Sequence, residues 1–176
     1  MKNKKGFTLI ELIVIIIIIG VILVFSLPNV TSTLERQKKD AMIVDAKDFV
    51  HKTQAYMLKK MDYPTATEPT KFFCLSTTTV GGKKCNGVDP RKEIKDSPFG
   101  SKYKRDLSTV TVTYSSKEVL LTDKDGNTIY DESGIPKKET RIEYTYTIYL
   151  IDESNHKIDN INIDVLNTDA KYEKVS

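Results

Sequence analysis

The sequence opens with MKNKKGFTLIELIVIIIIIGVILVFSLP at residues 1–28, and this stretch decides how the chain is organised. From Phe7 to Leu27 every position is apolar or small, apart from Thr8, Glu11 and Ser26. As a helix with a rise of about 1.5 Å per residue, these 21 residues cover about 30 Å, the thickness of the hydrocarbon core of a bilayer. We therefore predict a membrane-spanning helix over residues 7–28.

Glu11 is out of place in a membrane-spanning helix. An ionised carboxylate inside a bilayer costs about 3 kcal/mol unless a cation pairs with it. The sequence therefore indicates a helix whose acid later meets a partner cation. The alternative is an ordinary signal anchor in which Glu11 lies near the membrane surface.

The same residues resemble the class III signal of type IV pilins and type II secretion pseudopilins. The resemblance rests on the basic leader at residues 1–6, the GFTLIE motif at Gly6–Glu11, Gly20 in the apolar run and Pro28 after it. It implies that a prepilin peptidase cleaves between Gly6 and Phe7 and methylates the new amine of Phe7. It also implies that Glu11 meets the terminal amine of a neighbouring subunit during filament assembly.

Beyond the span we expect an amphipathic helix over residues 29–62. Pro28 lacks an amide hydrogen, so it should kink or loosen the helix, and the family resemblance implies unwinding there in the filament. The alternative is that Pro28 only marks the end of the span. Apolar residues then recur at helical spacing and form a stripe that should pack on a domain core: Met42, Ile43, Ala46, Phe49, Val50, Thr53, Tyr56 and Met57. Tyr63-Pro64 should end the helix.

Residues 63–107 are expected to form a connecting region that contains a disulfide. Both cysteines of the chain, Cys74 and Cys85, lie here across a short loop. A disulfide between them suits a domain outside the cytoplasm, and free thiols are the alternative. Zinc is disfavoured because the two histidines, His51 and His156, are far away in the sequence.

The connecting region also holds Ser97-Pro98-Phe99-Gly100, followed by Tyr103. This stretch resembles the aspartate-proline-aromatic-glycine turn, with a following tyrosine, of major pseudopilins in type II secretion. A serine stands here in place of the aspartate.

Residues 108–176 are rich in strand patterns and predict an antiparallel sheet of four or five strands. Asp125-Gly126 is a strong hairpin signal between two of them. Three segments alternate between apolar and polar positions, and one face of the sheet that they form should pack under the helix: Thr109–Tyr114, then Ile142, Tyr144, Tyr146, Ile148 and Leu150, then Ile161, Ile163 and Val165. With the long helix packed on this sheet, the expected fold class is α+β.

The domain shows no residues that predict catalysis. It has no nucleophile at a recognisable elbow, and Gly81-Gly82-Lys83-Lys84 lacks the spacing of a phosphate-binding loop. Asp123, Asp125 and Asn127 resemble the start of a calcium loop, but Gly134 stands where its final glutamate belongs. We expect no enzyme and no cofactor, with calcium at these three residues as a secondary hypothesis beside a plain Asp-Gly turn.

Charge and leader together predict the topology. The chain has 27 basic and 24 acidic residues, and removal of the leader with its three lysines leaves 24 of each. This balance gives no reason to expect a specific nucleic-acid partner. The leader lysines favour a cytoplasmic N-terminus, so a single span would place the domain outside the cell membrane.

The sequence therefore predicts a filament subunit, either of a type IV pilus or of a type II secretion-like pseudopilus. The resemblance implies four partners: prepilin peptidase, other pilin subunits in a homopolymer, an inner-membrane assembly platform, and membrane lipid before assembly. A membrane-anchored adhesin or receptor that does not polymerise is the alternative. A surface pilus, a secretion pseudopilus and a competence filament are not distinguished at this level.

Overall fold

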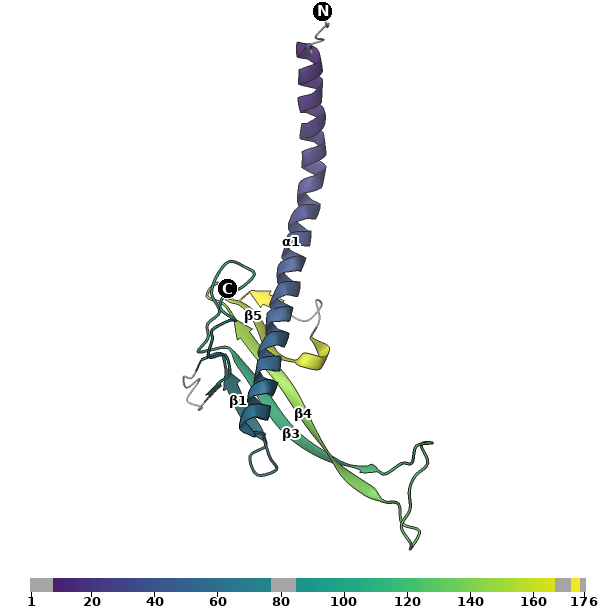
Figure 1. The fold of residues 1–176 in the computed structure, drawn as a ribbon. Helices are drawn as coiled ribbons and strands as arrows, with labels where there is room; N and C mark the ends of the chain where they lie inside the picture. Colours follow the sequence, from purple (N-terminus) through teal and green to yellow (C-terminus); the bar gives the residue numbers. More distant parts are fainter. Residues whose placement is uncertain (1–7, 77–84, 167–171, 175–176) are drawn as a thin grey trace, which may run out of the picture.

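The computed structural model describes residues 8–76, 85–166 and 172–174, and the side chains of residues 25–29 and 172–174 lie outside this description. The described residues form one long helix and a six-stranded sheet (Figure 1). The elements are α1 (Leu9–Lys60), β1 (Thr70–Cys74), β2 (Asn86–Gly87), β3 (Thr109–Leu120), β4 (Lys138–Ile151), β5 (His156–Asn162), the short 3-10 helix η1 (Ile163–Val165) and β6 (Tyr172–Lys174). The expected α+β class is confirmed.

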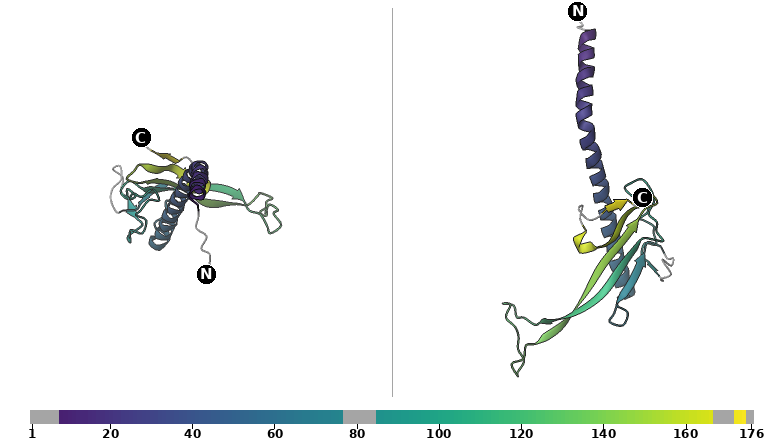
Figure 2. Two further views of the ribbon diagram at one scale, coloured as in Figure 1. Left: turned by 90° about the horizontal axis from the view of Figure 1, so that it is seen from above. Right: turned by 180° about the vertical axis from the view of Figure 1, so that it is seen from behind.

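The helix α1 has 52 residues, which makes it about 78 Å long. Its first half stands clear of the rest of the molecule, and its second half lies on the sheet (Figures 1 and 2). The helix continues through Pro28 and ends at Lys60, where Met61 takes a left-handed conformation with φ of 52°. The predicted end before Tyr63-Pro64 is therefore confirmed.

The predicted apolar stripe packs on the core. Six of its residues are buried: Met42, Ala46, Phe49, Val50, Thr53 and Met57. Tyr56 and Ile43 are partly buried against the same cluster. The sheet supplies the opposite side of the core through Phe73, Val110, Val112, Ile148 and Leu150. Each large apolar side chain buried in this way stabilises the fold by roughly 1.5–3 kcal/mol, so the second half of α1 is held by packing.

The sheet has the order β2-β1-β3-β4-β5-β6, and its pairs are antiparallel except for β1 with β2. Residues 108–176 supply the antiparallel strands β3, β4, β5 and β6, so the antiparallel sheet of four or five strands expected there is confirmed, while the whole sheet is larger and contains one parallel pair. The two additional strands, β1 and β2, come from the segment expected to be only a connection. A strand as short as β1 carries little period-two signal, and its place is set by pairing with the distant β3, as in Phe73 with Val110.

The expected strand through Ile161, Ile163 and Val165 ends early. β5 stops at Asn162, whose side chain accepts a 2.9 Å hydrogen bond from the amide of Asp164 and caps η1. Val165 is consequently exposed instead of facing the core. The local cap overrides the alternating pattern, because asparagine oxygens readily bond the amide two residues ahead.

Strands β3 and β4 pair from Thr109 with Tyr149 to Leu120 with Lys138 and project well beyond the body of the domain (Figure 1). Ile142, which was expected to face the helix, lies on this projection and is exposed. The predicted Asp125-Gly126 turn is present, with Gly126 at φ of 87°. It lies in the segment that joins the two strands.

Within the residues that the structure describes, no helix has the length and apolar character needed to cross a membrane. The predicted span over residues 7–28 includes Phe7 and the side chains of residues 25–28, all of which lie outside the description.

Candidate functional site: the start of the helix and the turn at Ser97

The first turn of α1 is closed by a reciprocal pair of hydrogen bonds between Thr8 and Glu11. The amide and hydroxyl of Thr8 donate to Oε2 of Glu11 at 2.8 Å and 2.9 Å, and the Glu11 amide donates to the Thr8 hydroxyl at 3.4 Å. This is a capping box. Thr-x-x-Glu at residues 8–11 is the sequence signal for such a cap, which was not among the predicted features.

The cap fixes where the Glu11 carboxylate lies. Thr8 occupies one oxygen, Oε2, and among the described residues no donor bonds the other oxygen, Oε1. The acid is therefore held at the N-terminal end of the helix with one oxygen open to a further donor. A negative charge there also interacts favourably with the helix dipole.

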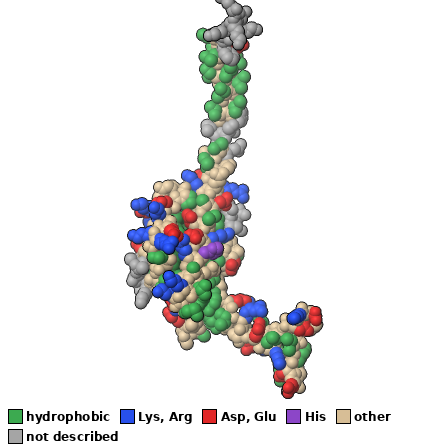
Figure 3. All heavy atoms as spheres, viewed as in Figure 1, with side chains coloured by type: hydrophobic (Ala, Val, Ile, Leu, Met, Phe, Trp, Pro, Cys, Tyr) green, Lys and Arg blue, Asp and Glu red, His purple; other side chains and the backbone are tan. Residues whose placement is uncertain are grey.

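The surface around this acid is apolar on every side. All large hydrophobic side chains from Leu9 to Val24 are at least 42% exposed. Figure 3 shows them as a continuous green column above the domain. Such a surface exceeds the apolar patches that soluble monomers expose, so it marks a site of contact with lipid or with another protein.

The other processing and assembly residues are only partly visible. Gly6 and Phe7, the predicted cleavage and methylation site, lie outside the described residues. Pro28 lies inside α1, but its side chain is among those not described. Their roles therefore stay predictions.

The Ser97 turn forms a second constellation, which ties two distant parts of the chain together. Ser97 accepts a hydrogen bond from the amide of Gly100 at 2.9 Å through its carbonyl, and Gly100 has φ of 88°. The Ser97 hydroxyl donates to Oδ2 of the buried Asp152 at 2.8 Å. Nδ1 of His156 lies 3.0 Å from the same carboxylate oxygen, and its ring stacks on Phe99.

Tyr103 connects this turn to α1. Its ring is buried, and its hydroxyl donates a 2.8 Å hydrogen bond to Oδ2 of Asp45 on the helix. Burial, followed by the charge of Asp45, raises the pKa of Tyr103, so its hydroxyl keeps its proton and acts as the donor. Burial also raises the pKa of Asp45, which the Tyr103 hydrogen bond partly offsets. The contact fixes the helix against the loop region.

A serine, an aspartate and a histidine meet here, but they are not arranged for nucleophilic catalysis. Ser97 and His156 both bond the same oxygen of Asp152, so the aspartate lies between them. In a hydrolytic triad the histidine must accept the proton of the serine. The hydroxyl of Ser97 instead donates to a carboxylate, which gives the cluster a structural role.

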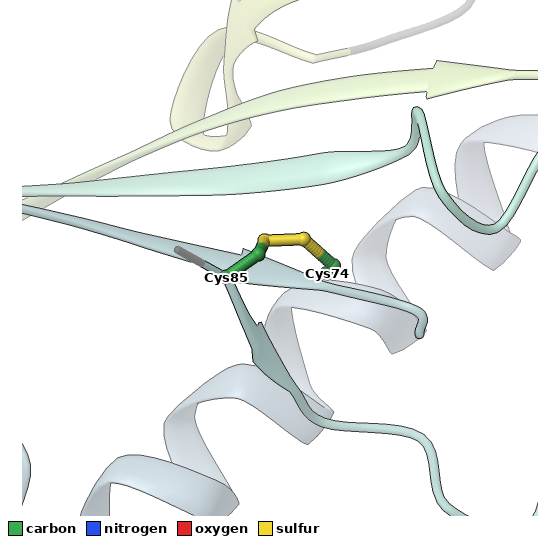
Figure 4. Close-up of a disulfide and its surroundings, with 2 residues drawn as sticks. All are labelled: Cys74 and Cys85. Carbon is green, nitrogen blue, oxygen red and sulfur yellow. A yellow bond between two sulfur atoms is a disulfide. The ribbon is translucent and has the colours of Figure 1, made fainter. Parts of the chain in front are cut away.

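Cys74 and Cys85 form a disulfide, as the spacing allowed (Figure 4). Their Cα atoms are 5.8 Å apart, within the usual range for such a bond. Both cysteines are buried. The bond joins the end of β1 to the residue that precedes β2 and so holds the parallel edge of the sheet.

The residues of the secondary calcium hypothesis form a turn that is held by its own hydrogen bonds. Oδ1 of Asp123 accepts from the amides of Asp125 and Asn127 at 2.9 Å each, and Oδ2 accepts from the Asn127 side chain at 3.3 Å. Among the described residues no group of three or more His, Cys, Asp or Glu side chains is placed to hold a metal ion.

Comparison with known proteins places these features in context. Residues 1–27 match the family model described as the prokaryotic N-terminal methylation motif. The chain is 23% identical over 103 residues to type II secretion system core protein G of Vibrio cholerae, an alignment that covers 58% of this chain and 70% of the relative. The corresponding protein of Escherichia coli K12 is 32% identical over 66 residues, which cover 38% of this chain and 46% of the relative.

A third relative is also a type II secretion system core protein G. The core protein G of Dickeya chrysanthemi is 25% identical over 103 residues, covering 58% of this chain and 67% of the relative. No solved structure matches the chain significantly. The chain is thus pilin-like: it carries the N-terminal methylation motif of the class III signal, it has an α+β fold with a long N-terminal helix, and it shows homology to the type II secretion pseudopilin G.

Proposed function

We propose that this chain is a structural subunit of a filament, assembled through its apolar N-terminal helix after cleavage by a prepilin peptidase. The observation that carries the proposal is the exposed apolar helix from Leu9 to Val24, headed by Glu11, inside a matched N-terminal methylation motif. Neighbouring helices would cover this surface in a filament, and lipid would cover it beforehand.

The similarity to type II secretion core protein G favours a pseudopilus over a surface pilus or a competence filament. The partners of this proposal are prepilin peptidase, further copies of the subunit and the inner-membrane assembly platform. Before assembly the chain would span the cell membrane once, with its domain outside the cytoplasm, a location that suits the disulfide. Its role would be assembly instead of catalysis.

Glu11 supplies the specific contact in this mechanism. After cleavage behind Gly6, the new terminal amine belongs to Phe7, and its cation would pair with the Glu11 carboxylate of a neighbour. The capping box presents that carboxylate with one oxygen open. Inside a bundle of apolar helices such a pair is worth more than in water, while an unpaired acid is strongly unfavourable.

Mass spectrometry of the native protein tests the proposal. We expect a chain that starts at N-methylated Phe7, and we expect Gly6→Val to remain uncut in the membrane and outside filaments. A mature chain that starts at Met1, or one that starts beyond Leu27, would overturn the proposal and favour a membrane-anchored adhesin or another anchored protein.

A further inference from the structure

The projecting part of the hairpin is an arm that the core does not need. It comprises residues 115–143, where β3 and β4 continue as an isolated pair beyond Tyr114 and Tyr144. Every described side chain from Ser115 to Glu118 and from Tyr130 to Glu143 is exposed. Both views in Figure 2 show the arm pointing away from the body. An isolated two-stranded hairpin is at best marginally stable in water, so the arm contributes little to the stability of the domain and is a candidate for binding a partner.

The end of the arm is built from two copies of one turn, eight residues apart. In the first, Oδ1 of Asp123 accepts from the amides two and four residues ahead, each at 2.9 Å. In the second, Oδ1 of Asp131 accepts from the amides of Ser133 and Ile135, again at 2.9 Å. Each turn has glycine at its fourth position with positive φ, Gly126 at 87° and Gly134 at 77°.

Three backbone hydrogen bonds close these turns into a ring. The amide of Leu121 donates to the carbonyl of Lys137 at 2.9 Å, the amide of Ile129 donates to Leu121 at 2.8 Å, and the amide of Lys137 donates to Ile129 at 2.8 Å. We call residues 122–136, which this ring encloses, the tip. A tip fixed in this way loses little conformational entropy when it binds a partner.

The surface of the tip combines negative charge with apolar side chains. It holds four acids, Asp123, Asp125, Asp131 and Glu132, against one lysine, Lys124. Tyr130 and Ile135 are 57% and 60% exposed in the same segment. Figure 3 shows red and green side chains together at the end of the arm. Large exposed side chains beside charges are typical of protein-binding surfaces.

A groove with the complementary character lies at the end of α1. It has a volume of about 540 Å³ and runs between the last helical turns and the segment 87–93. Tyr56, Val88 and Pro90 give it an apolar lining, and Lys59, Lys60 and Arg91 give it positive charge. Its two acids, Asp89 and Glu93, are paired with Arg105 and Lys52, so the net charge of the lining is positive. Among the described residues no acid forms an ion pair with Lys59 or Lys60, and Arg91 reaches only Glu93 at 3.8 Å.

The tip does not meet the groove of its own chain. In Figures 1 and 2 the arm extends to the side, away from the lower end of α1. Contact between these two different surfaces therefore joins two chains head to tail. Repeated contacts of this kind continue without limit when the rotation does not close, which is how helical filaments grow.

We infer that the tip of one subunit docks into the groove of a second copy of this chain. Asp131 and Glu132 would face Lys59, Lys60 and Arg91, while Tyr130 and Ile135 enter the apolar floor. The contact rests on the proposed filament function, and it adds a link between globular domains to the packing of the N-terminal helices.

Cross-linking in assembled filaments tests the inference. A full chain that carries both Lys60→Cys and Ser133→Cys should give a ladder of disulfide-linked multimers under mild oxidation. Chains with either substitution alone should not form this ladder. Lys60→Cys with Ser115→Cys, at the base of the arm, is the matched control and should not form it either.

Charge reversal is the second part of the test. In the two-cysteine chain, Lys59→Glu with Arg91→Glu should lower the ladder yield roughly fivefold through like-charge contact. Glu132→Lys, which leaves the hydrogen bonds of Asp131 in place, should do the same, and the groove and tip reversals together should restore the yield. Because these side chains are exposed, folding is preserved.

The outcomes separate this inference from the proposed function. Filaments that contain N-methylated Phe7 but give no ladder refute the docking contact and leave the filament function intact. Links from the Lys60→Cys thiol to a different protein, or a ladder that is indifferent to charge reversal, also refute it. Absence of any filament from the wild-type chain overturns the proposed function and the docking contact with it.

Discussion

The guanidinium of Arg105 lies 3.1 Å from the carboxylate of Asp89, and this ion pair fixes the segment that walls the groove. The Asp89 side chain is 2% exposed and that of Arg105 is 17% exposed. Arg105 also donates to the carbonyls of Ile94 at 2.7 Å, Asp89 at 2.8 Å and Leu75. One side chain thus joins the end of β1 to residues 89–94.

Replacement of Asp89 should lower the stability of the fold, because it leaves the largely buried guanidinium of Arg105 unpaired. Asp89→Ala leaves Arg105 without its counter-ion and frees the amides of Glu93 and Ile94, which the carboxylate accepts at 3.2 Å and 3.1 Å. We expect a loss of about 3 kcal/mol in the free energy of unfolding, measured by urea denaturation of the full chain in detergent. Asp106→Ala, at an exposed carboxylate, is the control and should change little; equal effects would contradict the assignment.

Asp152 should make the stability depend on pH in the acid range. Burial alone raises its pKa, but hydrogen bonds from Ser97 and from the backbone and ring of His156 outweigh burial and lower the pKa below its ordinary value. A depressed pKa in the folded state contributes stability above the unfolded value of about 4, and that stability is lost as the pH falls through the folded value.

We therefore expect Asp152→Asn to lower stability at pH 7 by about 1–3 kcal/mol and to flatten the decline of stability below pH 5. Denaturation midpoints measured between pH 3 and pH 7 check this. Asp106→Asn should keep the wild-type pH profile. A wild-type profile in the Asp152 variant would show that the hydrogen bonds to Ser97 and His156 contribute nothing to acid stability.

Features with a local cause were predictable from the sequence. The stripe from Met42 to Met57 has the helical period, and each buried member follows from spacing alone. The Asp125-Gly126 turn follows equally from its residue types. The Thr8–Glu11 cap is equally local, because Thr-x-x-Glu is a capping signal that lies within four residues.

Features that depend on distant partners were not predictable. The bond between Ser97 and Asp152 joins residues 55 positions apart, and no short window shows it. The ring at Leu121, Ile129 and Lys137 depends on three backbone amides, which carry no side-chain signal. Likewise β2 is a strand only because it pairs with β1 beside the disulfide.

The disulfide should be fully formed in the exported protein and should support the edge of the sheet. Its cysteines are 11 positions apart, and closing a loop of this size stabilises the folded chain by roughly 2–3 kcal/mol in the chain-entropy model. Thiol labelling of the denatured, unreduced protein should find no free cysteine. Cys74→Ala with Cys85→Ala should lower the free energy of unfolding by that amount, whereas two labelled thiols in the exported protein would contradict the bond.

We expect the charge of Glu11 to be needed for assembly in addition to its role as a helix cap. Substitutions at Thr8 and Glu11 separate these two roles. Thr8→Val removes the hydroxyl that bonds Glu11 but keeps the acid, so it should cost the helix about 1 kcal/mol and still assemble. Glu11→Gln keeps the side-chain length and capping ability but removes the charge, so it should be cleaved and inserted yet fail to enter filaments. The measurement is the ratio of filament to membrane-bound subunit for each variant expressed alone. If Thr8→Val lowers this ratio while Glu11→Gln assembles normally, the carboxylate serves only as a cap and no cation pairs with Glu11 in the filament.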